Sequence, residues 1–352
     1  MKIFVIGPFD SIYMFQYVKE VLCDKNFKKN KEYFFFHSGG NIKNIYLELY
    51  NKVAEFMYYE KTYKRKNYSL IEALNDVNDI DVVHIHYIKI GYYKAIKKYR
   101  KNIKKIILTA WGSDFLRLNE KMYNKMNKFV EMSDIIVAGT DNLRNFVIEH
   151  FDKNLEGKIV DPQFGTPVID EIRKLKEDKN KSKCCNKLNV NNDKFVVGCG
   201  YNGSEAQQHI KIIKALDNMD KKYKKKIFIH VPAGYGLSRE YKTKLESLLK
   251  RTDFEYKIDE MFYEPSAMAK VRMATDIFIH GQITDASSSS VFEYVYADTV
   301  LVNGKWLHYS EIDKYKLAII EYDSFDELPL IVSNIIDNYY EEKKLVMKNR
   351  CV

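Results

Sequence analysis

The sequence contains no uninterrupted apolar stretch near the roughly 20 residues that a membrane-spanning helix requires. Its opening segment, MKIFVIG (1–7), is too short for the apolar core of a secretory signal and predicts a first buried strand. The five cysteines are odd in number, and none forms a CxxC pair of the kind that binds zinc. These absences argue against transmembrane, secreted and disulfide-framework proteins, so we expect a reducing, cytoplasmic location.

The sequence also lacks a dominant charge. Its 352 residues hold 57 Lys and Arg against 48 Asp and Glu, a net charge of +9, and 46% of them are hydrophobic, as in ordinary folded proteins. The excess is uneven: residues 1–150 and 151–250 each carry +8, and residues 251–352 carry −7. The front of the chain therefore suits an anionic partner, and nucleic acid is permitted without being required.

Short apolar runs recur along the chain, and most are followed by a longer segment with helical periodicity. Continuous apolar runs are typical of strands buried on both faces of a parallel sheet, and their alternation with helices indicates right-handed βαβ units. The predicted strands are residues 2–7, 33–38, 81–87, 104–110, 134–140, 195–200, 226–231, 254–258, 276–281 and 299–303.

This pattern predicts an α/β protein with two Rossmann-like domains. The polar stretch near residues 170–193 interrupts the rhythm and predicts a linker. The expected parts are a first domain over 1–165, a linker over 166–193, a second domain over 194–325, and a C-terminal helix over 326–352, for which packing back on the first domain is one option.

Glycines follow two strands of the second half, at the edge where parallel sheets bind ligands. Residues 198–203 (GCGYNG) match GxGxxG, but the next strand ends in His-Val-Pro without the acid that a dinucleotide site needs. We therefore favour a turn in which Gly203 and Ser204 offer N–H groups and a hydroxyl to a phosphate, with Ser204 as a simple helix cap as the alternative. The next loop, with Gly234, Tyr235 and Gly236, permits close approach of a ligand or is an ordinary turn.

The strongest signal is DASSSSVFE at residues 285–293, which follows a strand and opens a helix. Serine hydroxyls and N–H groups at a helix start can hold a diphosphate. Glu293 lies about one turn further along, within reach of ribose hydroxyls, and Asp285 precedes the helix. The alternative is a serine-capped helix with a surface Glu. The serines concerned are Ser287, Ser288, Ser289 and Ser290.

Asp285-x7-Glu293 resembles the Glu-x7-Glu element of GT-B glycosyltransferases that use nucleotide sugars. DVVHIHY with IILTAWGSD (106–114), VGCGYNGSEAQQHIKIIKAL and IHVPAGYG resemble further units of that fold in the same order, so the resemblance covers nearly the whole chain. The combination NGS, QHI and VPAGYG is also similar to the TDP-N-acetylfucosamine:lipid II transferases. The first acid is Asp here, and His209 lies where the family often has a basic residue, so the donor and its phosphate contacts stay open.

The resemblance implies a GT-B fold, in which two Rossmann-like domains face each other across a cleft, the second holding the donor. It implies that Glu293 binds the ribose and that Asp285 lies by the donor sugar. The residues expected to bind the donor are Gly203, Ser204, His209, Gly234, Tyr235, Gly236, Ser287, Ser288, Ser289, Ser290 and Glu293.

The first half offers polar side chains at strand ends as well. His84 and His86 share one face of a strand, where hydrogen bonding to a substrate is a better interpretation than a metal site, since no third ligand is near in sequence. Asp114 is a candidate general base or a turn cap. We predict His86, Asp114 and Asp285 as catalytic residues, and the acceptor-binding residues are Asp10, His84, Trp111 and Ser113.

Residues 61–68 (KTYKRKNY) and 91–105 (GYYKAIKKYRKNIKK) interleave tyrosine with lysine and arginine. The simplest interpretation is a solvated helix face. A functional one is attachment to an anionic membrane surface, and a third is nucleic acid, for which no recognised module is present.

Together these features predict a glycosyltransferase that moves a hexosyl or acetamidodeoxyhexosyl group from a nucleotide-diphosphate sugar to a lipid-linked saccharide, in bacterial cell-surface polysaccharide synthesis. We expect retention of configuration by family analogy, no obligatory metal or other cofactor, no nucleic acid partner, and a peripheral position at the inner face of the plasma membrane. The alternatives are a nucleotide-sugar 2-epimerase of the same fold and a non-catalytic sugar-nucleotide or nucleic-acid binding protein.

Overall fold

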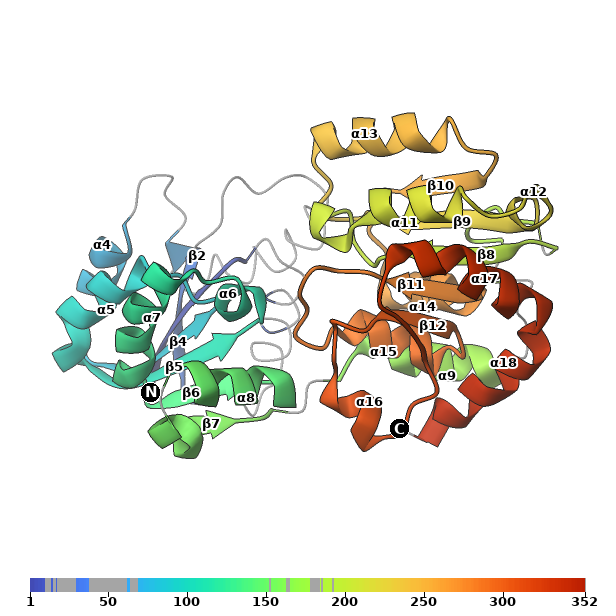
Figure 1. Cartoon of the computed structure of the whole chain (residues 1–352). Coiled ribbons are helices and arrows are strands. Elements are labelled where there is room, and N and C mark those ends of the chain that lie inside the picture. Colours follow the sequence, from blue (N-terminus) through green and yellow to red (C-terminus); the bar gives the residue numbers. More distant parts are fainter. Residues whose placement is uncertain are drawn as a thin grey trace. The chain divides into compact units, whose positions relative to one another are not determined.

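The computed structural model describes residues 1–9, 14, 17, 30–37, 62–63, 69–151, 153–162, 165–177, 184, 186–191 and 193–351. The chain divides into two compact units, residues 1–164 and 165–352, each built on its own sheet (Figure 1). The predicted helices that fall between residues 9 and 61 lie outside the described residues, apart from single positions.

Seven strands of the first unit form one sheet in which every described neighbour pair is parallel. In spatial order they are β3 (Thr62–Tyr63), β2 (Glu32–His37), β1 (Lys2–Gly7), β4 (Ile80–His86), β5 (Ile103–Ala110), β6 (Ile135–Ala138) and β7 (Ile159–Val160). The strand order reverses between β1 and β4, and folds of this kind bind ligands beyond the carboxyl ends of the strands at such a reversal. The apolar runs predicted five of these strands to within about two residues at each end.

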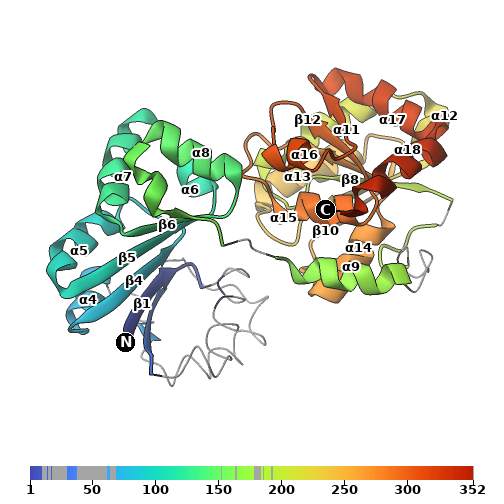
Figure 2. The same cartoon turned by 90° about the horizontal axis from the view of Figure 1, so that it is seen from below.

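Helices of the first unit cover one face of this sheet (Figure 2). They are α4 (Leu70–Asn75), α5 (Tyr92–Tyr99), α7 (Glu120–Met132) and α8 (Asp141–His150), with the short α6 (Ser113–Leu116) after β5. Their apolar stripes join the strand residues in one core cluster that includes Leu74, Ile96, Phe129 and Val147. Ser69, Asn119 and Thr140 cap three of these helices through their side chains, as their types at helix starts predict.

The second unit has a six-stranded sheet of parallel pairs. In spatial order the strands are β10 (Glu255–Asp259), β9 (Ile227–Pro232), β8 (Phe195–Cys199), β11 (Ile277–His280), β12 (Val300–Gly304) and β13 (Ile320–Tyr322). The order 3-2-1-4-5-6 is that of a Rossmann fold, with its reversal between β8 and β11. The three-residue edge strand β13 was not predicted, because its run is too short to show a period.

Helices cover both faces of the second sheet. On one face lie α11 (His209–Leu216), α13 (Arg239–Leu249), α17 (Leu328–Asp337) and α18 (Tyr339–Val346), and on the other α9 (Pro167–Glu177), α14 (Pro265–Ala274) and α15 (Ser289–Tyr296), with short segments η4 (Glu205–Gln207), α12 (Lys221–Lys224) and α16 (Ser310–Lys314) between strands. Within the described residues no helix combines the length and apolarity needed to cross a bilayer.

The segment predicted as a linker, residues 166–193, contains α9 instead of only extended chain. Val168 and Ile172 of α9 are buried against Ala269 and Ala297, because polar residues of this segment alternate with an apolar stripe of helical period. The predicted single C-terminal helix is two helices, since the chain turns at Asn338 between α17 and α18.

Candidate active site

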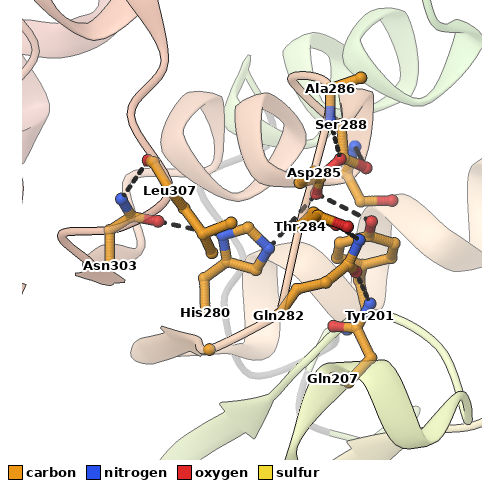
Figure 3. Close-up of polar contacts among 12 residues, drawn as sticks. Tyr201, Gln207, His280, Gln282, Thr284, Asp285, Ala286, Ser288, Asn303 and Leu307 are labelled. Atoms are coloured by element: carbon orange, nitrogen blue, oxygen red, sulfur yellow. Dashed lines mark hydrogen bonds and ion pairs between the residues drawn. The ribbon is translucent and has the colours of Figure 1, made fainter. Parts of the chain in front are cut away.

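Asp285 lies beyond the carboxyl end of β11, next to the reversal of strand order in the second unit. Its Oδ2 accepts a hydrogen bond from the Tyr201 hydroxyl at 2.9 Å, and its Oδ1 accepts one from the Ala286 N–H at 2.7 Å (Figure 3). The side chain is 8% exposed. Burial first, and the Asp285 carboxylate second, raise the pKa of Tyr201 well above its usual value, so this phenol stays a neutral donor.

His280, the last residue of β11, faces the same carboxylate. Its Nε2 lies 3.4 Å from Asp285 Oδ2, and its Nδ1 lies 3.0 Å from Asn303 Oδ1 at the end of β12. The ring is fully buried and stacks on Phe278 and Tyr309. A strand-end histidine and a loop aspartate are thereby held as a pair within a polar network (Figure 3).

Side-chain amides join the loops after β8 and β11. Gln207 donates to Gln282, and Gln208 donates to the Gly281 carbonyl at 2.6 Å. The Ile283 N–H also donates to the Ala206 carbonyl at 2.9 Å. These bonds fix the two loops that carry Tyr201 and Asp285.

Glu293 lies inside α15 and is almost fully buried. Its Oε2 accepts from Arg272 Nε at 3.0 Å, and its Oε1 accepts from the Thr166 hydroxyl at 2.8 Å. Arg272 is 1% exposed, its guanidinium lies 4.2 Å above the Tyr294 ring, and its Nη1 has no hydrogen-bond partner among the described residues. The predicted ribose acid is therefore held between a buried cation and a hydroxyl.

The four serines lie at the start of α15, as predicted. Ser288 is the N-cap and accepts from the Ser290 N–H, and Ser287 has a positive φ of 71° and donates its hydroxyl to Glu311 at 2.9 Å. No contact among the described residues uses the N–H groups of Ser287, Ser288 or Ser289. Three N–H groups at a helix start are thus available to an anion.

The N–H groups of Gly203 and Ser204 are not available in the same way. The Gly203 N–H donates to the Tyr235 carbonyl at 2.8 Å, and the Ser204 N–H donates to Asn202 Oδ1 at 2.9 Å. The Ser204 hydroxyl caps η4. The structure thus favours the capping alternative for Ser204 and uses Gly203 to join the loops after β8 and β9.

Close packing explains the glycines of these loops. A Cβ on Gly203 would lie 2.5 Å from Leu237 Cβ, and one on Gly234 would lie 2.6 Å from the Met261 carbonyl oxygen. Gly236 has a positive φ of 78°. Tyr235, between Gly234 and Gly236, is 44% exposed.

His209 is fully buried at the start of α11. Its Nδ1 lies 3.3 Å from the Tyr241 hydroxyl, and its Nε2 has no hydrogen-bond partner among the described residues. Burial lowers the pKa of His209 to about 4, so it is neutral at pH 7 and does not replace the family's basic residue as a cation.

A small cavity opens beyond the ends of β9 and β10, beside Tyr201 and Gly234. His230 and Asp259 form a buried pair on its wall, with Nε2 and Oδ2 3.4 Å apart, and the Tyr263 hydroxyl donates to the same carboxylate at 2.7 Å. Although burial opposes it, these partners lower the pKa of Asp259 below its usual range.

The first unit places His84 and His86 at the matching edge of its own sheet. Their rings are 4.1 Å apart, which confirms that they share one face. His84 lies between the Tyr17 hydroxyl at 3.1 Å and the Thr109 hydroxyl at 2.8 Å, whereas His86 Nε2 is buried and has no partner among the described residues. Burial, reinforced for His86 by its neighbour, lowers the pKa of both rings, that of His84 to about 4.

Asp114 joins the loops that follow β4 and β5. Its Oδ2 accepts from the Ile88 N–H and its Oδ1 from the Trp111 N–H, both at 2.9 Å. Burial raises the pKa of Asp114 to about 6. Asp114 therefore caps a turn, which is the alternative interpretation of this residue, and its role as a general base stays a prediction. Ser113 begins α6 beside it, and the predicted acceptor residue Asp10 lies outside the described residues.

Several residues of these networks were not predicted from the sequence. His280 ends an apolar strand as His86 does, so the same strand-end argument would have found it. Arg272 gives no such signal, because a single arginine in a helix is normally exposed. The described residues contain no group of three or more His, Cys, Asp or Glu side chains placed to hold a metal ion.

The first unit is similar to a known protein family. Residues 52–142, all in the first unit, match the family described as "Glycosyl transferase 4-like". A search of curated protein sequences finds no match.

Solved structures resemble the whole chain. A glycosyltransferase from Rickettsia africae ESF-5 superposes with a TM-score of 0.70 at 14% identity, covering 99% of this chain and 92% of that one. Anabaena Alr3699/HepE in complex with UDP gives 0.66 at 11% identity over 100% and 94%. An α,α-trehalose 6-phosphate synthase from Burkholderia multivorans gives 0.66 at 11% identity over 99% and 92%. The protein therefore has the GT-B fold that the order of its motifs predicts, and its first unit is similar to glycosyl transferase 4-like domains.

Proposed function

We propose that this protein is a glycosyltransferase that takes its sugar from a nucleotide-diphosphate sugar bound by the second unit. The observation that carries the proposal is that α15, beside the switch point of the second sheet, begins with open N–H groups and has one buried carboxylate before it, Asp285, and one within it, Glu293. The structures of HepE with UDP and with UDP-glucose support a nucleotide sugar as the ligand of this fold.

In this proposal the diphosphate lies at the start of α15, against the N–H groups of Ser287, Ser288 and Ser289. The ribose hydroxyls donate to Glu293, where one of them takes the place of the Thr166 hydroxyl on Oε1 while Arg272 keeps Oε2 in position. The remaining wall of the donor site carries no positive charge. It consists of His209, Gly203, Ser204 and the loop of Gly234, Tyr235 and Gly236.

The chemistry follows from where charge develops. Breaking the bond to the donor sugar leaves negative charge on the diphosphate, which oriented N–H groups and the helix dipole stabilise. Asp285 orients the donor sugar, and no resident metal or cofactor is required. Retention of the anomeric configuration, and a hexosyl or acetamidodeoxyhexosyl group as the sugar, are part of the same proposal by analogy alone.

The acceptor would be bound by the first unit, by His84, His86, Trp111, Ser113 and Asp114, with Asp114 or His86 taking its proton. We propose a lipid-linked saccharide as acceptor, in the synthesis of a bacterial cell-surface polysaccharide at the inner face of the membrane. Its support is the charge of +8 on residues 1–150 and the exposed lysines of α5.

Nucleotide affinity tests the donor site. Calorimetric titration with UDP and UDP-glucose, and a thermal-shift screen that adds GDP- and TDP-sugars, should show binding that Glu293→Ala weakens at least tenfold and Glu240→Ala, an exposed glutamate of α13, leaves unchanged. Equal affinity in Glu293→Ala removes the donor site. Conversion of the nucleotide sugar to its epimer without an acceptor would replace the transferase by an epimerase.

Vesicle sedimentation tests the membrane proposal separately. Three exposed lysines lie between the end of α5 and the start of β5: Lys97, Lys98 and Lys101. This is the edge of the sheet opposite the carboxyl ends of its strands. Their joint change to serine should release the protein from anionic vesicles, whereas the same change at Lys221, Lys222 and Lys225 of the second unit should not. Equal sedimentation of both triple variants contradicts the membrane surface.

A further inference from the structure

We propose that Tyr201 is a positioning residue whose hydroxyl holds the Asp285 carboxylate in the orientation that receives a hydroxyl group of the donor sugar. The inference rests on the proposed function only in its last step, the contact between Asp285 and the sugar. The link between Tyr201 and Asp285 follows from the hydrogen bonds of the second unit alone.

Tyr201 anchors Asp285 from a different loop. Asp285 Oδ2 accepts a hydrogen bond from the Tyr201 hydroxyl at 2.9 Å, and Oδ1 accepts one from the Ala286 N–H at 2.7 Å. Ala286 is the next residue in the chain and moves with the carboxylate, whereas Tyr201 follows β8, 84 residues earlier. His280 Nε2, which lies 3.4 Å from Oδ2, has no hydrogen-bond partner among the described residues. The bond from Tyr201 therefore fixes the carboxylate relative to the sheet.

Two buried glutamines hold Tyr201 against the loop of Asp285 (Figure 3). The Tyr201 N–H donates to Gln207 Oε1 at 3.2 Å, and Gln282 Nε2 donates to the Thr284 carbonyl at 2.6 Å. A backbone N–H requires an acceptor and a backbone carbonyl requires a donor, so each side-chain amide has one orientation. In that orientation Gln207 Nε2 donates to Gln282 Oε1, as the structure shows. These bonds form a closed ring of contacts, which the bond between Tyr201 and Asp285 completes.

The phenol of Tyr201 remains a donor near neutral pH. Burial first, and the Asp285 carboxylate second, raise its pKa well above the usual value. A neutral phenol has one proton to donate, and the carboxylate oxygen Oδ2 accepts it. A carboxylate oxygen can accept two hydrogen bonds, so Oδ1 can accept one from a sugar hydroxyl beside that from the Ala286 N–H.

Tyr201 also lines the small cavity beyond the ends of β9 and β10, beside Pro232 and Tyr235. Its hydroxyl, by contrast, contacts Asp285. The variant Tyr201→Phe keeps every carbon atom of the side chain and loses only the hydroxyl. It therefore removes the anchor of Asp285 and leaves the wall of the cavity in place, which separates the two contacts of this residue.

Amide hydrogen exchange tests the anchor without any ligand. The Ala286 N–H donates to Asp285 Oδ1, so its exchange rate reports the orientation of the carboxylate. We expect Tyr201→Phe to raise this rate about tenfold, because loss of a hydrogen bond to a charged group frees the carboxylate to turn. Tyr340→Phe removes the same atom from an exposed tyrosine of α18 and should leave the rate unchanged. An unchanged rate in Tyr201→Phe overturns the proposal.

Binding tests the consequence for the ligand. Calorimetric titration of Tyr201→Phe should give an affinity for UDP-glucose about tenfold below that of the wild type, and an affinity for UDP within about twofold of it. Tyr340→Phe should bind both ligands as the wild type does. Equal losses for UDP and UDP-glucose would overturn the role in sugar binding, because a general disturbance of the donor site affects both ligands.

A double-mutant cycle separates positioning from direct contact. If Tyr201 acts through Asp285, Tyr201→Phe should change the affinity for UDP-glucose by less than about twofold in the Asp285→Ala background, where no carboxylate is left to hold. A loss of about tenfold in that background as well would assign the Tyr201 hydroxyl a direct contact with the sugar and overturn the positioning role.

The measurements with and without ligand distinguish the two claims. Absence of UDP binding in the wild type would contradict the proposed donor, and the exchange rate of the Ala286 N–H would still decide whether Tyr201 holds Asp285. Faster exchange in Tyr201→Phe together with unchanged affinity for UDP-glucose would retain the anchor and overturn its role in sugar binding.

Discussion

Arg272 and Glu293 form a buried ion pair in the second unit. Both side chains are at most 6% exposed, and the guanidinium retains an Nη1 without a hydrogen-bond partner among the described residues. Such a pair contributes little net stability over an apolar pair of the same volume. The role of the pair is to hold the Glu293 carboxylate in one position, because the buried Arg272 does not move as an exposed side chain would.

Removing one partner of this pair should therefore be costly. We expect Arg272→Met to lower the free energy of unfolding by about 3–5 kcal/mol, because Glu293 is left buried and unpaired. The double variant Arg272→Met/Glu293→Gln should regain much of that loss. Urea denaturation measures both, and Arg251→Met, at an exposed arginine, serves as the control. A double variant no more stable than the single one would mean that the loss comes from packing and not from the uncompensated charge.

Asp114 links the first unit's stability to pH. Its pKa is raised to about 6 by burial, above the value of about 3.9 expected in the unfolded chain, so the native state binds the additional proton. The stabilisation is complete below about pH 4 and is lost as the pH rises through about 6. We expect the wild type to gain about 2 kcal/mol relative to Asp114→Asn between pH 7.5 and 4.

This difference isolates Asp114 from the other titrating groups of the unit. Burial lowers the pKa of His84 to about 4, which destabilises the unit in acid, but that effect is common to both proteins and cancels. Denaturation curves across the pH range, with Asp161→Asn at an exposed carboxylate for comparison, provide the measurement. A constant difference between wild type and Asp114→Asn would show that the native carboxyl is not the group that binds the proton.

At the scale of single residues, the position of a polar side chain at or after the end of an apolar run predicts its place in the fold. His86, Asp114 and Asp285 follow apolar runs, so their place at a sheet edge could be predicted, although their partners could not. Arg272 was missed because burial of a helix arginine depends on Glu293, and no local pattern marks the two as a pair.

At the scale of elements, the loops at the carboxyl edge of the second sheet form one connected structure. Gly203 joins the loops after β8 and β9, Gly234 packs against Met261 after β10, and Gln207 reaches Gln282 after β11. Each loop therefore depends on its neighbours for its shape. A displacement of one of these loops should therefore shift the neighbouring loops.

Gly203→Ala should displace this structure. The new Cβ would lie 2.5 Å from Leu237 Cβ, and overpacking of this kind costs about 1–3 kcal/mol. We expect a lower melting temperature and weaker binding of UDP. Gly91→Ala in the first unit is the matched control, since a Cβ there meets nothing within 4 Å, and it should be neutral or stabilising by about 0.4–1 kcal/mol. Unchanged UDP affinity in Gly203→Ala would show that the loop is not part of the donor site.

Element types and ends could be predicted where a run was long and apolar, as in β1, β5 and β9. The prediction failed for β13, which is a short edge strand, and for α9, whose lysines hid an apolar stripe. The sequence predicts a phosphate as the acceptor of the Gly203 N–H. In the structure the acceptor is the carbonyl of Tyr235, which is 32 residues away, and sequence patterns report contacts at such a separation poorly.

At the scale of the whole molecule, each unit contains its own core. One apolar cluster lies entirely in residues 1–164, and the others that surround the second sheet lie entirely in residues 165–352. The described contacts of Asp285 and Glu293 are also made within the second unit. Folding and donor binding should therefore be separable from the first unit, provided that the second is cut at its true boundary.

Two fragments test that boundary, because the sequence placed the second domain at residue 194 and the structure places the second unit at residue 165. Residues 165–352 keep the Thr166 bond to Glu293 and the 2.9 Å ion pair between Lys176 and Asp298, whereas residues 194–352 lose both. The shorter fragment also loses the burial of Val168 and Ile172, worth about 3–6 kcal/mol together. We expect the longer fragment to unfold cooperatively and to bind UDP as the full chain does, and the shorter one to melt at a much lower temperature with weaker binding. Equal melting temperatures would mean that α9 is a linker after all, and an unfolded longer fragment would mean that the second unit depends on the first for its stability.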